Sequence, residues 1–244
     1  MTARTVLAIT GAHRVDFLQS LITNDVLRAD GAIIYAALLT PQGKFIADFF
    51  VIGQSDRLLI DVDSVVAPNL FQRLSMYRLR ADIQINETGL IVSRGLDARP
   101  EGAFDDPRHK ALGWRHYGEH DISVGTTQWQ AIEIANLIPT TGVDLTPDTY
   151  ILEANFEAIN GVDFKKGCFV GQEIVARMKH KVTLKKGLRR VIIEGKAVTG
   201  DVITSGGKPA GTLHSVHGNE GIAYLRFDRT DGMTTQKASL HIAD

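Results

Sequence analysis

Cys168 is the only cysteine among the 244 residues of the chain. A single thiol excludes an internal disulfide, and it excludes a zinc or cluster site built only from cysteines of one chain. Gly167 and Gly171 flank it, and glycines permit a close approach of a ligand to the backbone. A small buried hydrophobic side chain is the ordinary role of a free cysteine. The glycine setting favours a working thiol over that role.

The position of this thiol along the chain suggests how it would be activated. Apolar residues recur at helical spacing from Gln172 to Lys179, so Cys168 should lie just before a helix N-terminus. The positive end of a helix dipole and the ammonium groups of Lys165 and Lys166 favour a thiolate over a thiol. A thiolate is both a nucleophile and a metal ligand, so we expect one of these two roles.

The segment from Lys165 to Arg190 carries nine of the 27 basic residues and one acid, Glu173. Its positive field could dock a polyanion, such as the polyglutamate tail of a folate, or contact RNA. A solvated helix face with charged strand edges is the plainer explanation. Sequence-specific RNA recognition is disfavoured because aromatic residues, apart from Phe169, are not interleaved with the basic ones.

The first ninety residues predict a β-α-β-β-β-α-β arrangement, with the helices on one face of an antiparallel sheet. Asn24 and Asp25 follow the first helix, where they could form a turn or the edge of a pocket. Asp63 or Ser64 could cap the second helix. The predicted strands are Thr5–Thr10, Ala32–Leu39, Phe45–Ile52, Arg57–Val62 and Ala81–Ile85, and the predicted helices contain Phe17 and Leu70.

The remainder of the chain divides into an irregular middle and a β-rich end. Arg99–Arg108 should be an exposed loop, and we expect a subdomain junction near residues 95–110. Helices are predicted around Trp129–Ile138 and over Asp148–Ile159. Four strands at spacings of about ten residues then indicate a small barrel or sandwich. They are Leu188–Ile193, Asp201–Thr204, Gly211–Val216 and Gly221–Arg226.

Composition limits the class of protein. The net charge is −1, so nothing global indicates nucleic-acid binding. No apolar run is long enough to cross a membrane, and the first residues do not form a secretory signal, so we expect a cytoplasmic protein. Neither a GxGxxG fingerprint nor a Walker A loop is present, which removes the commonest nucleotide sites.

The segment KGCFVGQEIVAR resembles the signature of YgfZ-type folate-binding proteins. FLQSLITNDV, LLTPQGKFIADF, YRLRADIQI and IPTTGVDL extend the resemblance over most of the chain, in the order of that family. Phe169 stands where the family usually has tyrosine, so no phenol hydrogen bond is expected there. The resemblance implies that Cys168 is the working group. It implies that the rest of the motif shapes the loop and its charge through Lys166, Gly167, Phe169, Gly171, Gln172, Glu173 and Arg177.

The same blocks resemble, more distantly, the glycine-cleavage T-protein, a folate-dependent aminomethyltransferase. In that enzyme the hairpin carries two aspartates, and the first is important for catalysis. This chain has Ala47-Asp48 at that pair, so aminomethyl transfer is not expected while folate binding is retained. The resemblance implies tetrahydrofolate or a derivative as cofactor, bound by Asn24, Asp25, Asp48 and Glu153.

The resemblance therefore implies an α+β fold with a T-protein-like core in residues 1–184 and a small C-terminal β-barrel in residues 185–244. It implies a folate-binding accessory protein for iron–sulfur enzymes, including tRNA-modifying ones, with client or assembly proteins as partners and without direct nucleic-acid binding. A one-carbon transferase and a non-catalytic interaction module remain as alternatives. Turnover of a methylamine-type substrate would favour the first, and an unreactive Cys168 the second.

Overall fold

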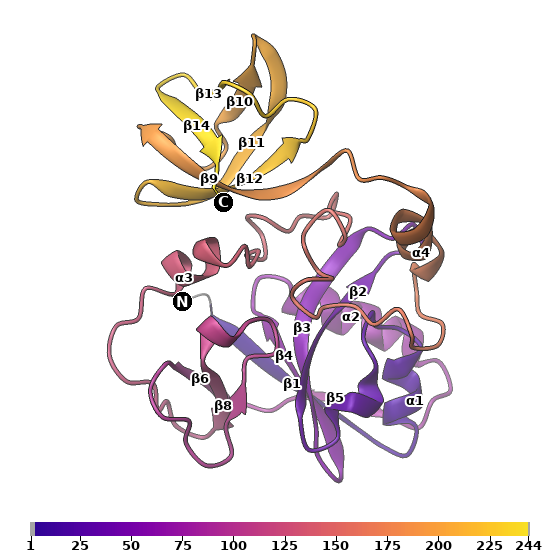
Figure 1. The fold of residues 1–244 in the computed structure, drawn as a ribbon. Coiled ribbons are helices and arrows are strands. Elements are labelled where there is room, and N and C mark those ends of the chain that lie inside the picture. The colour runs from indigo at the N-terminus through magenta and orange to yellow at the C-terminus, as the bar shows by residue number, and fades with distance from the viewer. Residues whose placement is uncertain (1–2, 244) are drawn as a thin grey trace.

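A computed structural model describes residues 3–243, and its amino-terminal part is a five-stranded antiparallel sheet (Figure 1). The strands lie in the order β2-β3-β4-β1-β5. They are β1 (Arg4–Thr10), β2 (Ile33–Leu39), β3 (Phe45–Gly53), β4 (Arg57–Asp63) and β5 (Gln84–Glu87). The predicted hairpin is confirmed, because β2 pairs with β3 around the turn at residues 40–44. The predicted strand Ala81–Ile85 begins three residues later than expected.

Two helices cover one face of this sheet, as the sequence predicts. They are α1 (Arg14–Gln19) and α2 (Ala67–Arg78), and a short 3-10 helix spans Val26–Ala29. Phe17, Leu70 and Leu74 pack with strand residues of that face in one apolar core. The predicted cap of α2 is wrong, since Val66 occupies the N-cap and the Asp63 carboxylate accepts from Val65 N just before it. The opposite face of the sheet is left for the rest of the core.

A small three-stranded sheet follows, in the order β6-β8-β7. Its strands are β6 (Ile91–Gly95), β7 (Phe104–Asp105) and β8 (Trp114–Gly118), with a 3-10 turn at Lys110–Leu112. The expectation of an exposed loop over Arg99–Arg108 is wrong at its end, because Asp106 and Arg108 are buried. The two side chains form an ion pair, which is how charged groups are accommodated away from water.

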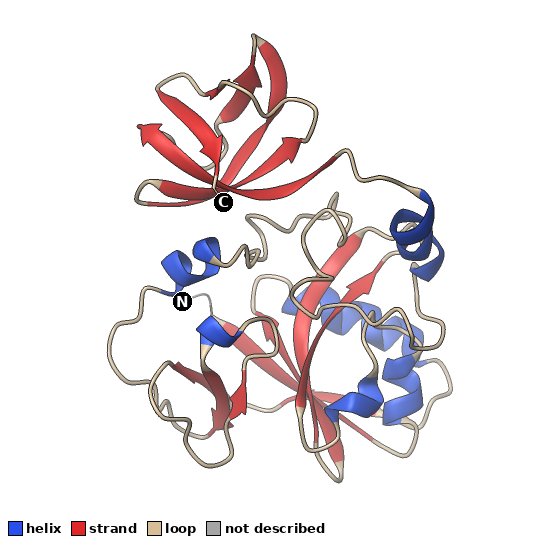
Figure 2. Cartoon of the chain, in the orientation of Figure 1, coloured by secondary structure: helices blue, strands red, loops and turns tan. Residues whose placement is uncertain are grey.

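The segment between this sheet and the Cys168 loop covers the open face of the five-stranded sheet. Helix α3 (Trp129–Ala135) is present, but the helix expected over Asp148–Ile159 is replaced by consecutive turns (Figure 2). Asn155 and Asn160 have φ of 67° and 57°, a left-handed conformation that interrupts a helix. The apolar residues of this segment are nevertheless buried in the core, among them Ile151, Phe156 and Ile159.

Helix α4 (Gln172–Lys181) leads into a closed barrel at the C-terminal end (Figure 1). The barrel strands are β9 (Lys186–Gly195), β10 (Val202–Ser205), β11 (Lys208–His217), β12 (Glu220–Arg226), β13 (Met233–Thr234) and β14 (Ala238–Ile242). The four strands predicted here are confirmed, and β13 and β14 close the barrel. It has its own apolar core, which includes Val191, Leu213 and Leu225. The division of the chain at residue 184 stays a prediction.

Candidate functional site

The thiol of Cys168 is exposed, in a loop that ends at the start of α4. Gly171 is the N-cap of that helix, with φ of 84°. A Cβ at this position would lie 2.7 Å from the carbonyl oxygen of Thr40, in the β2–β3 turn. A side chain at position 171 would therefore be strained and would clash with backbone. The turn of the hairpin and the start of α4 fix the end of the Cys168 loop.

Lys166 anchors the other end of this loop from inside the protein. Its Nζ donates to the carbonyl oxygens of Gln19 at 2.8 Å, Ile22 at 2.5 Å and Asn24 at 2.9 Å. Burial lowers the pKa of Lys166 to about 8, although Asp25 and Asp163 act to raise it. The ammonium thus ties the Cys168 loop to the segment after α1, which is a structural role that the sequence did not specify.

The other residues of the motif divide between packing and exposure. Phe169 is buried in the core, with the Lys166 ammonium 5.3 Å from its ring centroid. Gln172 N donates to Phe169 O. Gly167, Glu173 and Arg177 are exposed. The exposed part of the motif therefore consists of Gly167 and Cys168 in the loop and Glu173 and Arg177 on α4. The last turn of that helix carries Lys179, His180 and Lys181.

Asn24 and Asp25 serve the backbone of their own loop. Asn24 is buried, and its Nδ2 donates to the carbonyls of Tyr35 and Asn160, both at 2.8 Å. Asp25 is the N-cap of the 3-10 helix and accepts from Leu27 N. Asn24 also lines a cavity of about 230 Å³ with Arg28 and Val162. The side chains of Asn24 and Asp25, which the resemblance implied for folate binding, are thus used in hydrogen bonds within the protein.

Glu153 lies against the barrel. Its Oε2 accepts from the Tyr224 hydroxyl at 2.5 Å, and its carbonyl accepts from Leu188 N at 2.7 Å. It lies in one of the turns that replace the predicted helix. The carboxylate is thus bonded to β12, while its backbone is bonded to β9.

Of the two residues Ala47 and Asp48 in the β2–β3 hairpin, Asp48 faces the centre of the molecule. It is buried, and its carboxylate accepts from the Tyr35 hydroxyl at 2.8 Å and from Thr141 Oγ1 at 2.5 Å. Ala47 packs instead in the core under α1 and α2. In this chain an acid at position 47 would point into the helix-covered core. The alanine there therefore does not remove a carboxylate from the centre.

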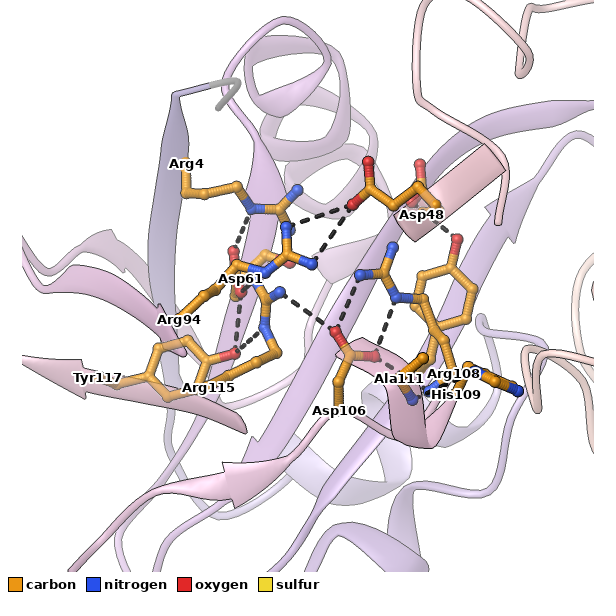
Figure 3. Close-up of polar contacts among 12 residues, drawn as sticks. Arg4, Asp48, Asp61, Arg94, Asp106, Arg108, His109, Ala111, Arg115 and Tyr117 are labelled. Atoms are coloured by element: carbon orange, nitrogen blue, oxygen red, sulfur yellow. Dashed lines mark hydrogen bonds and ion pairs between the residues drawn. The ribbon is translucent and has the colours of Figure 1, made fainter. Parts of the chain in front are cut away.

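A buried network of arginines and carboxylates fills that centre (Figure 3). Asp61 accepts from Arg4 Nε at 2.6 Å, from Arg115 Nη2 at 2.5 Å and from the Tyr117 hydroxyl at 2.8 Å. Asp106 links Arg115 to Arg108, with oxygen–nitrogen distances of 3.4 Å and 2.9 Å. The ring of Phe50 lies beneath three of these guanidinium groups, those of Arg4, Arg108 and Arg115.

The electrostatics of this network are strongly coupled. Burial acts to raise the pKa of Asp61, but Arg4 and Arg115 outweigh it and lower that pKa to about 2. For Arg94 the balance is opposite, because burial and repulsion from Arg115 and Arg108 lower its pKa to about 10. The Arg94 guanidinium donates only to the Glu133 carboxylate, at 3.3 and 3.4 Å, among side chains of the described residues. Arg94 therefore has a single, weakly bound counter-ion.

The network encloses a cavity of about 50 Å³, lined by Arg4, Asp48, Phe50, Asp63, Arg94, Arg108, Arg115, Glu133, Pro139, Thr140 and Thr141. Sites for ligands of folate size occupy roughly 300 Å³ or more. This cavity by itself is too small for tetrahydrofolate, and of the four residues expected to bind folate only Asp48 lines it.

The sequence carries a signal for this network that is separate from the Cys168 motif. Asp61 interrupts the apolar run LLIDV, and Arg94 and Arg115 lie within strands β6 and β8. A charged residue in the middle of a buried strand requires a partner, because an unpaired buried charge is costly. Charged residues within strands can therefore be identified from the sequence, but the partner of each one cannot.

Acid should destabilise the protein through Asp61. Its pKa is about 2 in the folded state and roughly 3.9 in an unfolded chain, so the unfolded state binds the proton first as the pH falls. The free energy of unfolding should drop by about 2 kcal/mol between pH 4 and pH 2. Urea unfolding at a series of pH values measures this, and Asp61→Asn should show a shallower slope. Equal slopes for both proteins would contradict the assignment.

Comparison with known proteins shows what this chain is similar to. Residues 185–244 match the model of the C-terminal beta-barrel domain of CAF17. The Iron-sulfur cluster assembly factor IBA57 homolog, mitochondrial, of Mycosarcoma maydis is 29% identical over 75% of this chain and 54% of its own length. The mouse and human Iron-sulfur cluster assembly factor IBA57, mitochondrial, are each 27% identical. These two alignments cover 99% and 98% of the chain, and 79% and 80% of the relatives. The chain thus spans little more than half of the fungal relative.

A solved structure shows the same fold. The glycine cleavage system aminomethyltransferase T from Bartonella henselae superposes with a TM-score of 0.78 at 15% identity, over 99% of this chain and 83% of that one. The predicted α+β T-protein-like fold with a C-terminal β-barrel is therefore confirmed.

The cytoplasmic location expected from the sequence is wrong by the same comparisons, because the relatives are named as mitochondrial proteins. Within residues 3–243, no helix is long and apolar enough to cross a membrane.

Proposed function

We propose that the protein supports the assembly of iron–sulfur clusters and that Cys168 is the group that contacts the cluster or the protein carrying it. The observation that supports this most directly is an exposed thiol whose loop is fixed at both ends, by Lys166 and by Gly171. The relatives named as iron-sulfur cluster assembly factors point to the same chemistry. A fixed, accessible sulfur is suited to transient ligation because a partner can reach it without unfolding the loop.

One thiol cannot hold a cluster alone. Clusters are ligated by several protein groups, usually four thiolates. Among residues 3–243 there is no group of three or more His, Cys, Asp or Glu side chains arranged to hold a metal ion. In the proposed role the cluster is a cargo, and the remaining ligands come from a partner. The interaction would pair Cys168 with a cluster-bearing assembly or client protein.

Two finer parts of the sequence-based hypothesis stay proposals. A YgfZ-type role in iron–sulfur enzymes that modify tRNA rests on the KGCFVGQEIVAR motif. Tetrahydrofolate binding rests on the resemblance to the T-protein, and the small central cavity and the scattered positions of Asn24, Asp25, Asp48 and Glu153 do not favour it. No step of the proposed function depends on a folate.

The role of the thiol can be tested by complementation. In cells depleted of their own assembly factor, the wild-type chain should restore the activity of a [4Fe–4S] enzyme, measured in extracts. Cys168→Ser should restore none, because a hydroxyl is a poor ligand for iron in a cluster. Its thermal midpoint should equal that of wild type, since the side chain is exposed.

Gln236→Ser, at an exposed turn of the barrel, is the control that should restore activity fully. Full restoration by Cys168→Ser would overturn the proposal for the thiol. If the wild-type chain also failed to restore activity while it was expressed and folded, the assembly role itself would be wrong.

A further inference from the structure

Arginines that line the central cavity have guanidinium donors without a partner among the described residues. Arg94 Nε is buried and has no hydrogen-bond partner within residues 3–243. Within the same residues, Nη1 of Arg4 and Nη1 of Arg108 also make no hydrogen bond, because the other nitrogens of both guanidiniums make the bonds to Asp61 and Asp106. A buried donor such as Arg94 Nε is normally paired, so its lack of a partner requires a physical explanation.

The charge around these donors selects the kind of acceptor. Burial is the main reason that the pKa of Arg94 is lowered to about 10, and repulsion from Arg115 and Arg108 adds to it. Four guanidinium groups and three carboxylates line the cavity. Asp48, a carboxylate that also lines the cavity, already accepts from Tyr35 and Thr141. An anion beside Arg94 would relieve the repulsion among the arginines, whereas a water molecule would only fill hydrogen bonds.

The volume limits the size of that anion. A water molecule needs roughly 10–15 Å³ of such space, so a cavity of about 50 Å³ holds a group of a few heavy atoms. A planar carboxylate meets this limit, and it matches the fork of a guanidinium with two parallel hydrogen bonds. A fused ring system does not fit.

A second pocket, of about 390 Å³, adjoins the cavity, and both are lined by Arg94, Glu133 and Thr140. Trp129 and His217 line the outer pocket, and the Arg94 guanidinium lies 3.9 Å from the Trp129 ring centroid. The bonds from Arg94 to Glu133 are 3.3 and 3.4 Å long, whereas good bonds from arginine to a carboxylate measure roughly 2.7–2.9 Å. Glu133 is thus a loosely held counter-ion between the two spaces.

We propose that this cavity binds the carboxylate group of a ligand, which replaces Glu133 on Arg94 and accepts from the unused Nη1 groups of Arg4 and Arg108. The carboxylate belongs either to a small free acid or to one end of a larger molecule whose body occupies the outer pocket beside Trp129. This binding is independent of Cys168.

Calorimetric titration of the full chain with sodium formate and with sodium benzoate tests the proposal. Ionic strength is held constant with sodium chloride. Wild type should show saturable binding, and Arg94→Gln should weaken it at least about tenfold because the bidentate partner is lost. Arg99→Gln is the matched control, since Arg99 is exposed and pairs with Asp105 away from the cavity. It should bind as wild type does.

A second variant keeps the test decisive if Arg94→Gln does not fold. Glu133→Gln removes the competing carboxylate, so it should tighten binding about tenfold. Tighter binding of benzoate than formate assigns the carboxylate to a larger ligand, and equal or weaker binding of benzoate assigns it to a small acid. Absence of saturable binding for both salts, or equal affinity in wild type and Glu133→Gln, would overturn the proposal. Cys168→Ser should leave every titration unchanged, which separates this result from the cluster-assembly role.

Discussion

Asp61→Asn should lower the free energy of unfolding by about 3–5 kcal/mol, because it leaves buried guanidinium groups without their counter-ion. Arg4 and Arg115 both direct a charged nitrogen at this carboxylate, and Tyr117 adds a hydroxyl. Asparagine has nearly the same shape, so the loss reports charge and hydrogen bonding rather than packing. Equilibrium unfolding in urea at pH 7 gives the difference directly.

The matched control is Asp105→Asn, the same substitution in strand β7 of the three-stranded sheet. The Asp105 carboxylate is exposed and pairs with Arg99 at the surface. Exposed pairs contribute about 0–1 kcal/mol, so the control should remain close to wild type. If both variants lost the same stability, the buried network would have no special contribution.

Lys166→Met should cost about 2–4 kcal/mol, because three buried carbonyl groups lose a charged donor. Those carbonyls belong to Gln19, Ile22 and Asn24, and methionine can replace the length of the lysine side chain but none of its bonds. Part of the loss is offset, since the buried ammonium no longer has to be desolvated. The amides of residues 163–170 should exchange with deuterium faster, because the loop loses its inner anchor.

Lys165→Met is the control for this change, one residue away and exposed. It should alter stability by less than about 0.5 kcal/mol and leave deuterium exchange in the loop unchanged. Protection of residues 163–170 in Lys166→Met equal to that of wild type would contradict the anchoring role, whatever the change in stability.

The parts of the fold that could be predicted are those with a local pattern. Two apolar runs in residues 33–53 flank a turn, so the hairpin follows from adjacent residues, and the barrel strands follow in the same way. The helix expected at residues 148–159 rests on Pro147 at its start and Gly161 at its end, yet the segment forms turns in which Asn155 and Asn160 have positive φ. Packing of its apolar side chains in the core there overrides these local helix signals.

The candidate site was predictable only where one segment makes it. Cys168 and its glycines are contiguous, so the exposed loop could be proposed from the sequence. The central network joins Asp61 to Arg115 across 54 positions and Asp48 to Thr141 across 93 positions. No periodicity links such residues, because their proximity is created by the fold. For the same reason, sequence could not show that Asn24, Asp48 and Glu153 lie in separate places.

The anchor at Lys166 has a consequence for the order of folding. Its partners precede it by 142 to 147 positions, and Thr23 Oγ1 donates to Gly161 O across 138. Contacts of such sequence separation form late, after the entropy of closing a long loop has been overcome. A ribosome needs on the order of ten seconds to add the intervening residues. During synthesis the Cys168 loop therefore takes its fixed conformation only after the segment at residues 19–24 has bonded to the segment at residues 161–166. Until then Cys168 lies in a loop without a defined conformation.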